Sequence, residues 1–352
     1  MRVLNYLEIA SPLRRSGIGT AVSHQRRALD GTDLTVLTSP WIGGTIRTAA
    51  TDALVGDGAF ARYDVAHCNL FGPGSVAVAV HARRNGIPLV AHAHAIGEEF
   101  AGSFRFSSRI APPLGRYLRW FYGAADLVLA PSDYAAESLR GQIEPPVRVI
   151  TNGVDAERLA GFESLRPASR ERFGLDSPVV STVGNVFERK GVTVFCELAR
   201  TIDADFAWFG PYDTGLHGSS IVRRWVRNPP NNVTFAGWVD DVRTAYAAGD
   251  VYLFPTKVET QGIAVLEAMA CGKPVVLRDI PVFEEFYTDG VDCLKCRSRP
   301  EFRAAIERLL GDPELRERLG DAARRTAAEH GLDRVADGLS AAYSTATRVV
   351  EE

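Results

Sequence analysis

The stretch VYLFPTKVETQGIAVLEAMACG, residues 251–272, carries the most information on the fold. It begins with a short apolar run at 251–254, of the kind that forms a buried strand. It turns through Pro255 and Gly262 and continues as a helical pattern from about Ile263. A strand, a loop and a helix in this order are typical of a β-α-β unit in a parallel sheet.

The same alternation extends in both directions from this stretch. Amphipathic segments near 20–30, 74–85, 110–124 and 132–141 predict helices between short buried strands. The predicted strands are residues 3–7, 34–37, 65–68, 89–92, 127–130 and 147–150, then 179–183, 206–209, 233–236, 251–254 and 274–277.

With 352 residues the chain is about twice as long as a usual single domain, so we expect two doubly wound α/β domains. A polar segment at 163–177 interrupts the alternation and places the boundary near residue 170. The predicted domains are 1–170 and 171–331, and a helix at about 332–352 packs back on the first. Parallel sheets bind ligands beyond the carboxyl ends of their strands, so the expected active site is a cleft where two such edges face each other.

The composition is that of an ordinary globular protein, with 46% hydrophobic residues, 24% charged residues and a net charge of −3. Five cysteines predict no disulfide framework, and we interpret the CxxC of Cys293 and Cys296 as buried thiols rather than a zinc or redox site. Neither a signal peptide nor a run of about 20 apolar residues is evident. We therefore expect a cytoplasmic protein, at most peripheral to a membrane, and no nucleic-acid partner.

Two glutamates frame the helix start within residues 258–272. Free backbone N–H groups near Ile263 and the positive end of the helix dipole predict an anion site, and Gly262 lets a phosphate approach closely. Glu259 precedes the helix and Glu267 lies more than a turn inside it, so they cannot form the acid and base pair of a glycosidase. We expect Glu259 to contact a sugar or its phosphate and Glu267 to accept hydrogen bonds from ribose hydroxyls.

A second phosphate-binding layout is VGNVFERKG at 183–191, where a strand and a glycine lead into a loop with a basic pair. Arg189 can hold phosphate oxygens with two hydrogen bonds, and Lys190 acts as a point charge. These charges would offset the negative charge on a departing diphosphate. We therefore expect neither a metal nor another cofactor.

The first domain has two further candidates. In SGIGT at 16–20, Gly17 and Gly19 follow the first strand; we interpret them as a loop that closes over a diphosphate, with a simple tight turn as the alternative. His92 and His94 share one face at the end of a strand and are a possible metal pair. No third ligand is evident nearby, which favours a catalytic or hydrogen-bonding role for His94.

Together these motifs resemble the family-4 glycosyltransferases, which have the GT-B fold of two Rossmann-like domains facing a central cleft. The resemblance covers nearly the whole chain, from the glycine loop through NGVD at 152–155 to the paired glutamates. Several details resemble the diacylglycerol glucosyltransferase branch. They are HAIGEEF at 94–100 with SF at 103–104, IAP at 110–112, ETQG at 259–262 and RDIPV at 278–282.

The resemblance implies a retaining, metal-independent transfer of a hexose, expected to be glucose from UDP-glucose, to a membrane lipid such as diacylglycerol. His94 would hydrogen-bond the transferred sugar, which Glu259 would also contact. The diphosphate would be bound by Arg189 and Lys190, and the ribose by Glu267.

Backbone groups complete the implied donor site. Those of Gly262, Ile263 and Ala264 would bind phosphate, and those near Trp238 and Val239 would meet the base. One departure from the family pattern is Asn185, because many relatives carry arginine at that position.

Residues 103–122 have the features of a helix on a membrane surface. No acidic residue interrupts 101–125, and residues 1–172 carry 19 Lys and Arg against 16 Asp and Glu, whereas the remainder carries 21 against 27. We expect this stretch to meet an anionic bilayer, with leucine and aromatic side chains inserting shallowly; a core helix is the alternative. The residues assigned to this surface are Arg105, Arg109, Arg116, Arg119 and Trp120.

Three other functions stay open at this point. They are those of a family-4 enzyme with a soluble or polyprenyl-linked acceptor, of a GT-B nucleotide-sugar epimerase, and of a non-catalytic protein that binds sugar nucleotides.

Overall fold

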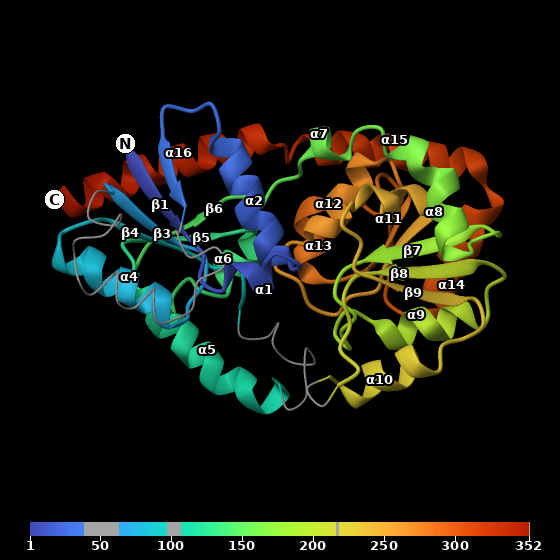
Figure 1. Cartoon of the computed structure of the whole chain (residues 1–352). Helices are drawn as coiled ribbons and strands as arrows, with labels where there is room; N and C mark the ends of the chain where they lie inside the picture. The colour runs from blue at the N-terminus through green and yellow to red at the C-terminus, as the bar shows by residue number, and fades with distance from the viewer. Residues whose placement is uncertain (39–62, 97–106, 216–217, 352) are drawn as a thin grey trace. The chain divides into compact units, whose positions relative to one another are not determined.

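The computed structural model describes residues 1–38, 63–96, 107–215 and 218–351 (Figure 1). These residues fall into two compact units. The first lies within Met1–Gly97, Pro112–Gly153 and Leu332–Glu352, and the second within Glu98–Ala111 and Val154–Gly331. Each unit contains one six-stranded parallel sheet, which confirms the α/β fold predicted from the alternating pattern.

The first sheet has the order β2-β1-β3-β4-β5-β6. Its strands are β1 (Arg2–Tyr6), β2 (Thr35–Thr38), β3 (Val65–Cys68), β4 (Leu89–His92), β5 (Leu127–Ala130) and β6 (Val147–Val149). The helices are α1 (Ala10–Leu13), α2 (Gly17–Leu29), α4 (Pro73–Arg84), α5 (Ser107–Gly123), α6 (Asp133–Glu137) and α16 (Leu332–Glu351). α2 and α16 cover one face of the sheet, where Val3 and Val90 pack with Leu29, Leu339 and Tyr343.

The second sheet has the order β12-β11-β10-β7-β8-β9. Its strands are β7 (Val179–Val183), β8 (Asp205–Phe209), β9 (Val233–Gly237), β10 (Val251–Phe254), β11 (Val275–Arg278) and β12 (Leu294–Cys296). The helices of this unit are α7 (Ala156–Leu159), α8 (Arg166–Phe173), α9 (Val192–Ala199), α10 (Ser220–Arg227), α11 (Arg243–Ala248), α12 (Ile263–Ala270), α13 (Pro281–Phe286), α14 (Arg299–Gly311) and α15 (Pro313–Ala328), with a 3-10 helix at Phe162–Leu165. α9, α10 and α14 lie on one side of the sheet, and α8, α11 and α12 on the other (Figure 1).

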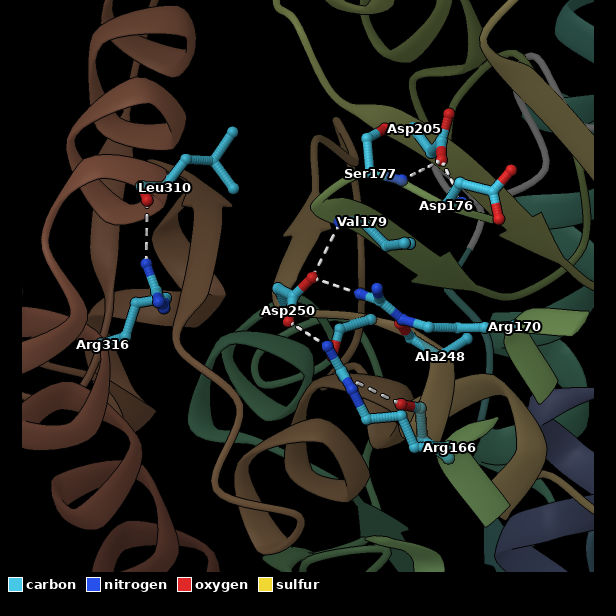
Figure 2. A network of polar contacts seen from close by, with 12 residues as sticks. Arg166, Arg170, Asp176, Ser177, Val179, Asp205, Ala248, Asp250, Leu310 and Arg316 are labelled. Atoms are coloured by element: carbon cyan, nitrogen blue, oxygen red, sulfur yellow. Dashed lines mark hydrogen bonds and ion pairs between the residues drawn. The ribbon is translucent and has the colours of Figure 1, made fainter. Parts of the chain in front are cut away.

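The main segment of the second unit begins at Val154, whereas the sequence pattern placed the boundary near residue 170. α8 is held to the second sheet by Asp250, whose carboxylate pairs with Arg166 and Arg170, each at 2.5 Å (Figure 2). The same carboxylate accepts a hydrogen bond of 2.8 Å from the backbone N–H of Val179, the first residue of β7. The polarity that suggested a boundary at 163–177 is therefore that of an ion-pair cluster.

Burial opposes ionisation of Asp250, yet its pKa lies below the ordinary value, because the Val179 N–H and the two arginines stabilise the charged form. The carboxylate is therefore ionised at neutral pH and fixes α8 against the start of β7.

Two of the places where the chain passes between units, after Gly153 and after Gly331, lie side by side. The backbone N–H of Val154 donates to the carbonyl oxygen of His330 at 2.8 Å, and Val154 forms an isolated parallel bridge with Gly331. After Gly331 the chain continues as α16, which packs along α2 of the first unit.

All five cysteines are free and buried, which confirms the interpretation of Cys293 and Cys296 as buried thiols. Burial raises the pKa of both thiols, that of Cys296 to about 12, so neither is a thiolate at neutral pH. Cys296 ends β12, a three-residue strand that the sequence pattern did not predict.

Each sheet has a point where its strand order reverses. β1 lies between β2 and β3, and β7 lies between β8 and β10. The connections that follow the neighbouring strands β1 and β3 therefore lead in opposite directions along the sheet, as do those that follow β7 and β10. Loops that follow such strands diverge and leave a crevice at their carboxyl ends. The residues that follow β1 and β3, and those that follow β7 and β10, are therefore the places to look for ligand-binding groups.

None of the helices in the described residues is long and apolar enough to cross a membrane.

Candidate functional site

In the second unit, the loops that follow β7 and β10 meet in direct backbone contact. Gly191, at the start of α9, has a φ of +86°, and a Cβ added there would lie 2.5 Å from the carbonyl oxygen of Pro255. Only glycine fits such a position. Next to it, the backbone N–H of Lys257 donates to the carbonyl oxygen of Arg189 at 2.8 Å. The VGNVFERKG and ETQG segments therefore form one continuous surface.

This contact brings together three of the predicted charged residues. The Lys190 ammonium donates to Oε1 of Glu259, and Arg189 lies 3.8 Å from the same oxygen. Arg189 also donates to the carbonyl oxygen of Val258 at 3.1 Å, and Thr256 donates to Glu259 at 2.9 Å. All three charged side chains are largely buried. The cluster has a net charge of +1 when all three groups are ionised.

Burial by itself would raise the pKa of Glu259. The charges of Lys190 and Arg189, with hydrogen bonds from Lys190 and Thr256, outweigh that effect, so the pKa lies below the ordinary value. Glu259 is therefore a carboxylate at neutral pH and has no proton to give to a leaving group.

The helix that carries Glu267 begins beside this cluster. Gly262 precedes α12 with a φ of +90°, and no side chain of the described residues caps the helix start. Ile263 and Ala264 are half-buried there. Glu267, one turn further, is buried, and its Oε2 accepts a hydrogen bond of 2.7 Å from the hydroxyl of Tyr246. Tyr246 thus fixes the orientation of the carboxylate that was predicted to bind ribose.

The segment that follows β9 contains the two residues whose backbone was predicted to meet the base. Trp238 is 37% exposed, and its indole N–H donates to Asp240 at 2.9 Å. Val239 is buried in the core with Phe209, so only its backbone is available to a ligand. Asn185 is half-buried between β7 and Val186.

The predicted glycine loop of the first unit is not a loop. Gly17 and Gly19 lie in the first turn of α2, and the Ser16 hydroxyl accepts the backbone N–H of Gly19 at 3.3 Å. A Cβ at Gly19 would overlap the carbonyl oxygen of Leu13, at the end of α1. Gly19 is therefore required by the close packing of α1 on α2, whereas Gly17 has open space around it.

His94 lies in a buried stack of imidazole rings. Its ring is parallel to that of His92, with centroids 3.9 Å apart, and His92 stacks on His67 at 5.5 Å. Nε2 of His94 is 3.0 Å from Oδ1 of Asn69, and His67 is hydrogen-bonded to the hydroxyl of Tyr343 on α16. His67 is the third histidine that the sequence analysis did not find nearby. The rings face each other instead of converging, and the described residues contain no His, Cys, Asp or Glu group suited to a metal.

These histidines are uncharged at neutral pH. Burial lowers the pKa of His67 and of His94 to about 3, and it lowers that of His92 well below the ordinary value. A hydrogen bond with the side chain of Asn152 opposes this effect in His94. His94 is thus suited to hydrogen-bond a substrate as a neutral ring and does not act as an imidazolium acid.

Glu8, which the sequence analysis did not single out, has a structural role. It is buried at the end of β1 and caps α4, where its carboxylate accepts the backbone N–H of Gly72 at 2.5 Å and that of Gly74 at 3.0 Å. Its Oε1 also accepts the hydroxyl of Ser75 at 2.8 Å. The signal was available in principle, because an acidic residue that directly follows a buried strand needs a partner.

The predicted membrane residues are only partly described. Arg105 lies outside the described residues, and the side chain of Arg109, within α5, is not described. Arg116 is exposed, Arg119 is half-buried, and Trp120 is 59% exposed.

The apolar residues beside these arginines do not project outward as predicted. Leu118, Phe121 and Tyr122 are buried in the first unit, because the helix uses that face to pack on the protein. Trp120 is the large apolar side chain left exposed in the described part of α5.

Residues 23–158 match the family model described as Glycosyltransferase Family 4, and residues 177–312 match the model described as Glycosyl transferases group 1. Over 99% of each chain, the protein is 31% identical to the processive diacylglycerol alpha-glucosyltransferase of Acholeplasma laidlawii. It is 29% identical to the alpha-D-kanosaminyltransferase of Streptomyces kanamyceticus, over 79% of this chain and 76% of that one.

Among solved structures, the sucrose-phosphate synthase of Thermosynechococcus elongatus superposes with a TM-score of 0.82 at 18% identity, covering 98% of both chains. The fold is therefore the GT-B fold, and the protein is a glycosyltransferase. It belongs to the family-4 glycosyltransferases, as the order of its motifs predicted.

The buried histidines predict a pH dependence of stability. In the unfolded chain a histidine takes up a proton below its ordinary pKa of about 6.5, whereas His67 and His94 resist protonation to about pH 3 when folded. The unfolded state therefore binds more protons between these values, and the free energy of unfolding falls as the pH drops from 7 towards 4.

His67→Gln should reduce that slope by about 1.4 kcal/mol per pH unit, because one proton fewer is taken up on unfolding. Urea unfolding at a series of pH values measures it. Between pH 8 and 9 the free energies of unfolding of the wild type and of His67→Gln should change with pH in parallel, since histidines are neutral in both the folded and the unfolded state. Equal slopes between pH 6 and 4 would contradict the burial of a neutral His67.

Proposed function

We propose that this glycosyltransferase transfers a hexose with retention, glucose from UDP-glucose, to a hydroxyl group of a membrane glycerolipid such as diacylglycerol. The observation that carries the proposal is the similarity to the Acholeplasma laidlawii diacylglycerol alpha-glucosyltransferase over nearly the full length of both chains. The charged cluster at the carboxyl ends of β7 and β10 supports the choice of a nucleotide-diphosphate donor.

In this proposal the second unit binds the donor. Arg189, Lys190 and the N–H groups at Gly262, Ile263 and Ala264 hold the diphosphate, since a net positive cluster and a helix start both attract anions. Glu259 accepts hydrogen bonds from the sugar while it remains paired with Lys190.

The rest of the nucleotide extends to two further groups of that unit. Glu267, oriented by Tyr246, accepts the ribose hydroxyls, and the backbone near Trp238 and Val239 meets the base.

The reaction breaks the bond between the anomeric carbon and the diphosphate oxygen. The acceptor hydroxyl oxygen bonds to that carbon from the same face, and its proton passes to the departing phosphate oxygen. The ionised Glu259 cannot supply a proton to the leaving group, so stabilisation falls to Arg189 and Lys190. His94 acts on the sugar as a neutral hydrogen-bonding ring whose contacts tighten in the transition state.

The proposal is tested by incubating the purified protein with UDP-glucose or GDP-mannose and vesicles that contain diacylglycerol, in excess EDTA. We expect a glucosylated lipid with the α configuration from UDP-glucose, because the positive charge at the donor site comes from side chains and a helix start. Loss of turnover in EDTA that Mg²⁺ or Mn²⁺ restores would overturn metal independence. Absence of lipid product, with sugar transferred to a soluble hydroxyl, would overturn the lipid acceptor.

That last outcome defines the second candidate function, a family-4 transferase with a soluble or polyprenyl-linked acceptor. The similarity to an enzyme named as a kanosaminyltransferase favours it, because that name identifies another transferred sugar and no lipid.

Glu267→Ala should weaken donor binding at least tenfold. A hydrogen bond to a charged group contributes roughly 1.5–3 kcal/mol, and the variant removes the acceptor of the ribose hydroxyls. In the variant the single proton of the Tyr246 hydroxyl is available to the carbonyl oxygen of Ala264, 3.2 Å away, so the helix start should survive. Calorimetric titration with UDP measures the change. Glu307→Ala, an exposed pair with Arg303 on α14, is the matched control and should bind UDP normally. A folded Glu267→Ala with normal affinity would contradict the assignment.

For the membrane, we propose that the exposed face of α5 meets anionic headgroups through Arg116 and Arg119, with Trp120 at the interface. Each arginine near the surface adds about 1 kcal/mol of attraction at low salt. Because Leu118 and Phe121 are buried, insertion is limited to Trp120, and charge contributes most of the binding.

Binding to vesicles should therefore rise with the content of anionic lipid and fall as salt is added. Arg116→Glu with Arg119→Glu should detach the protein from vesicles, as measured by co-sedimentation, while activity on a short-chain, detergent-soluble acceptor largely survives. The matched control is Arg334→Glu with Arg348→Glu on α16, which changes the net charge equally and should still bind. Wild-type binding that ignores both lipid charge and salt would remove the physical support for this surface.

A further inference from the structure

Five buried polar side chains of the first unit, with His94 among them, form a closed circuit of contacts. Its Nε2 contacts Oδ1 of Asn69 at 3.0 Å, and Nδ2 of Asn69 donates to Oδ1 of Asn5 at 3.0 Å. Nδ2 of Asn5 donates to Oε1 of Gln25 at 2.9 Å, and Nε2 of Gln25 lies 3.1 Å from Nδ1 of His92. The His92 ring, stacked on that of His94 at 3.9 Å, closes the circuit.

The hydrogen bonds of this circuit all run in one direction, from donor to acceptor. An amide oxygen only accepts hydrogen bonds, so the contact with Oδ1 of Asn69 requires that Nε2 of His94 carries the proton. Each following amide donates its own N–H to the next oxygen, and the last one donates to Nδ1 of His92. Hydrogen bonds aligned in this way polarise one another, which strengthens the preference for a single arrangement.

The fold leaves no solvent to replace these contacts. Asn5 is on β1, Asn69 follows β3, His92 ends β4 and Gln25 is on α2, and all are buried to within a few per cent. Nδ2 of Asn69 is also anchored 3.4 Å from the backbone carbonyl oxygen of Tyr6. The Asn69 amide is thus held on two sides and cannot turn its N–H group towards His94 without leaving donors or acceptors unpaired.

We propose that Asn69 is a positioning residue for glycosyl transfer, which fixes the orientation of the His94 ring and places its proton on Nε2. The inference rests on the proposed role of His94 in contacting the transferred sugar. Asn69 touches no reacting atom and acts through His94. The ring, which also has a hydrogen bond with the side chain of Asn152, is then held in one tautomer with its proton on Nε2.

The tautomer is measured directly by nitrogen NMR of the full-length protein with labelled histidine. In the wild type, Nε2 of His94 should have the shift of a protonated ring nitrogen and Nδ1 that of an unprotonated one. The reverse pattern, or rapid exchange between the two, would overturn the proposal without any substitution.

Two variants add functional readouts. Asn69→Ala should lower kcat at least tenfold and change the KM for UDP-glucose less than threefold, because the donor contacts lie in the second unit. Asn69→Asp places a carboxylate beside Nε2 and favours the protonated ring. His94 should then titrate within pH 4–8 and kcat should fall below that midpoint, whereas the wild type shows no such midpoint. A profile without the new midpoint in a folded Asn69→Asp would overturn the proposal.

Asn232→Ala is the matched control for the loss of a buried amide. Its side chain donates to the carbonyl oxygens of Ala199 and Ala204, each at 2.8 Å, far along the chain from His94. It should lose stability yet keep the wild-type kcat and His94 spectrum.

The His94→Ala variant distinguishes the role of His94 in glycosyl transfer from the positioning role of Asn69. Normal turnover in that variant would overturn the role of His94 itself, whereas its loss together with full activity of Asn69→Ala would overturn only the positioning role.

Discussion

The absence of a side chain at Gly191 is the constraint on which the charged site depends. A single methyl group there would lie 2.5 Å from the Pro255 carbonyl oxygen and would force apart the loops that follow β7 and β10. With glycine, the two backbones are close enough for the Lys257 N–H to reach Arg189, and the Lys190 ammonium then reaches Glu259. The charges are therefore positioned by a backbone contact, and the ion pair is its consequence.

The two units place polar groups in their interiors by opposite means. In the second unit, Glu259 stays ionised although it is buried, because cations and a hydroxyl surround it. In the first unit, His67, His92 and His94 are buried with hydroxyl or amide partners and are uncharged instead. The first arrangement suits the binding of a charged group, and the second suits the recognition of neutral hydroxyls, for which a fixed proton position matters more than a charge.

Much of the fold could be read from the sequence because strands of a parallel sheet are buried on both faces and appear as short apolar runs. β12 was missed because three residues at a sheet edge leave too weak a pattern. The boundary was expected near residue 170 because a sequence does not show that Arg166 and Arg170 share Asp250, which lies about 80 residues away. Charged candidates were found from local motifs, whereas Asn5, Asn69 and the stack on His67 come together only through strand order. The prediction that the leucine and aromatic side chains of α5 insert into a bilayer was wrong for those that are buried, because periodicity identifies an apolar side of a helix without showing what covers it.

The return of α16 to the first unit has a consequence for the order of folding. Val335, Leu339 and Tyr343 bury one face of a sheet whose strands are made before residue 150, with the whole of Val154–Gly331 between them. At roughly 5–20 residues per second, a ribosome needs on the order of 10–35 seconds for that segment. During this time the first sheet lacks part of its cover, whereas the second unit, apart from Glu98–Ala111, is made as one uninterrupted segment. Although it comes later in the sequence, the second unit can therefore be completed first during synthesis.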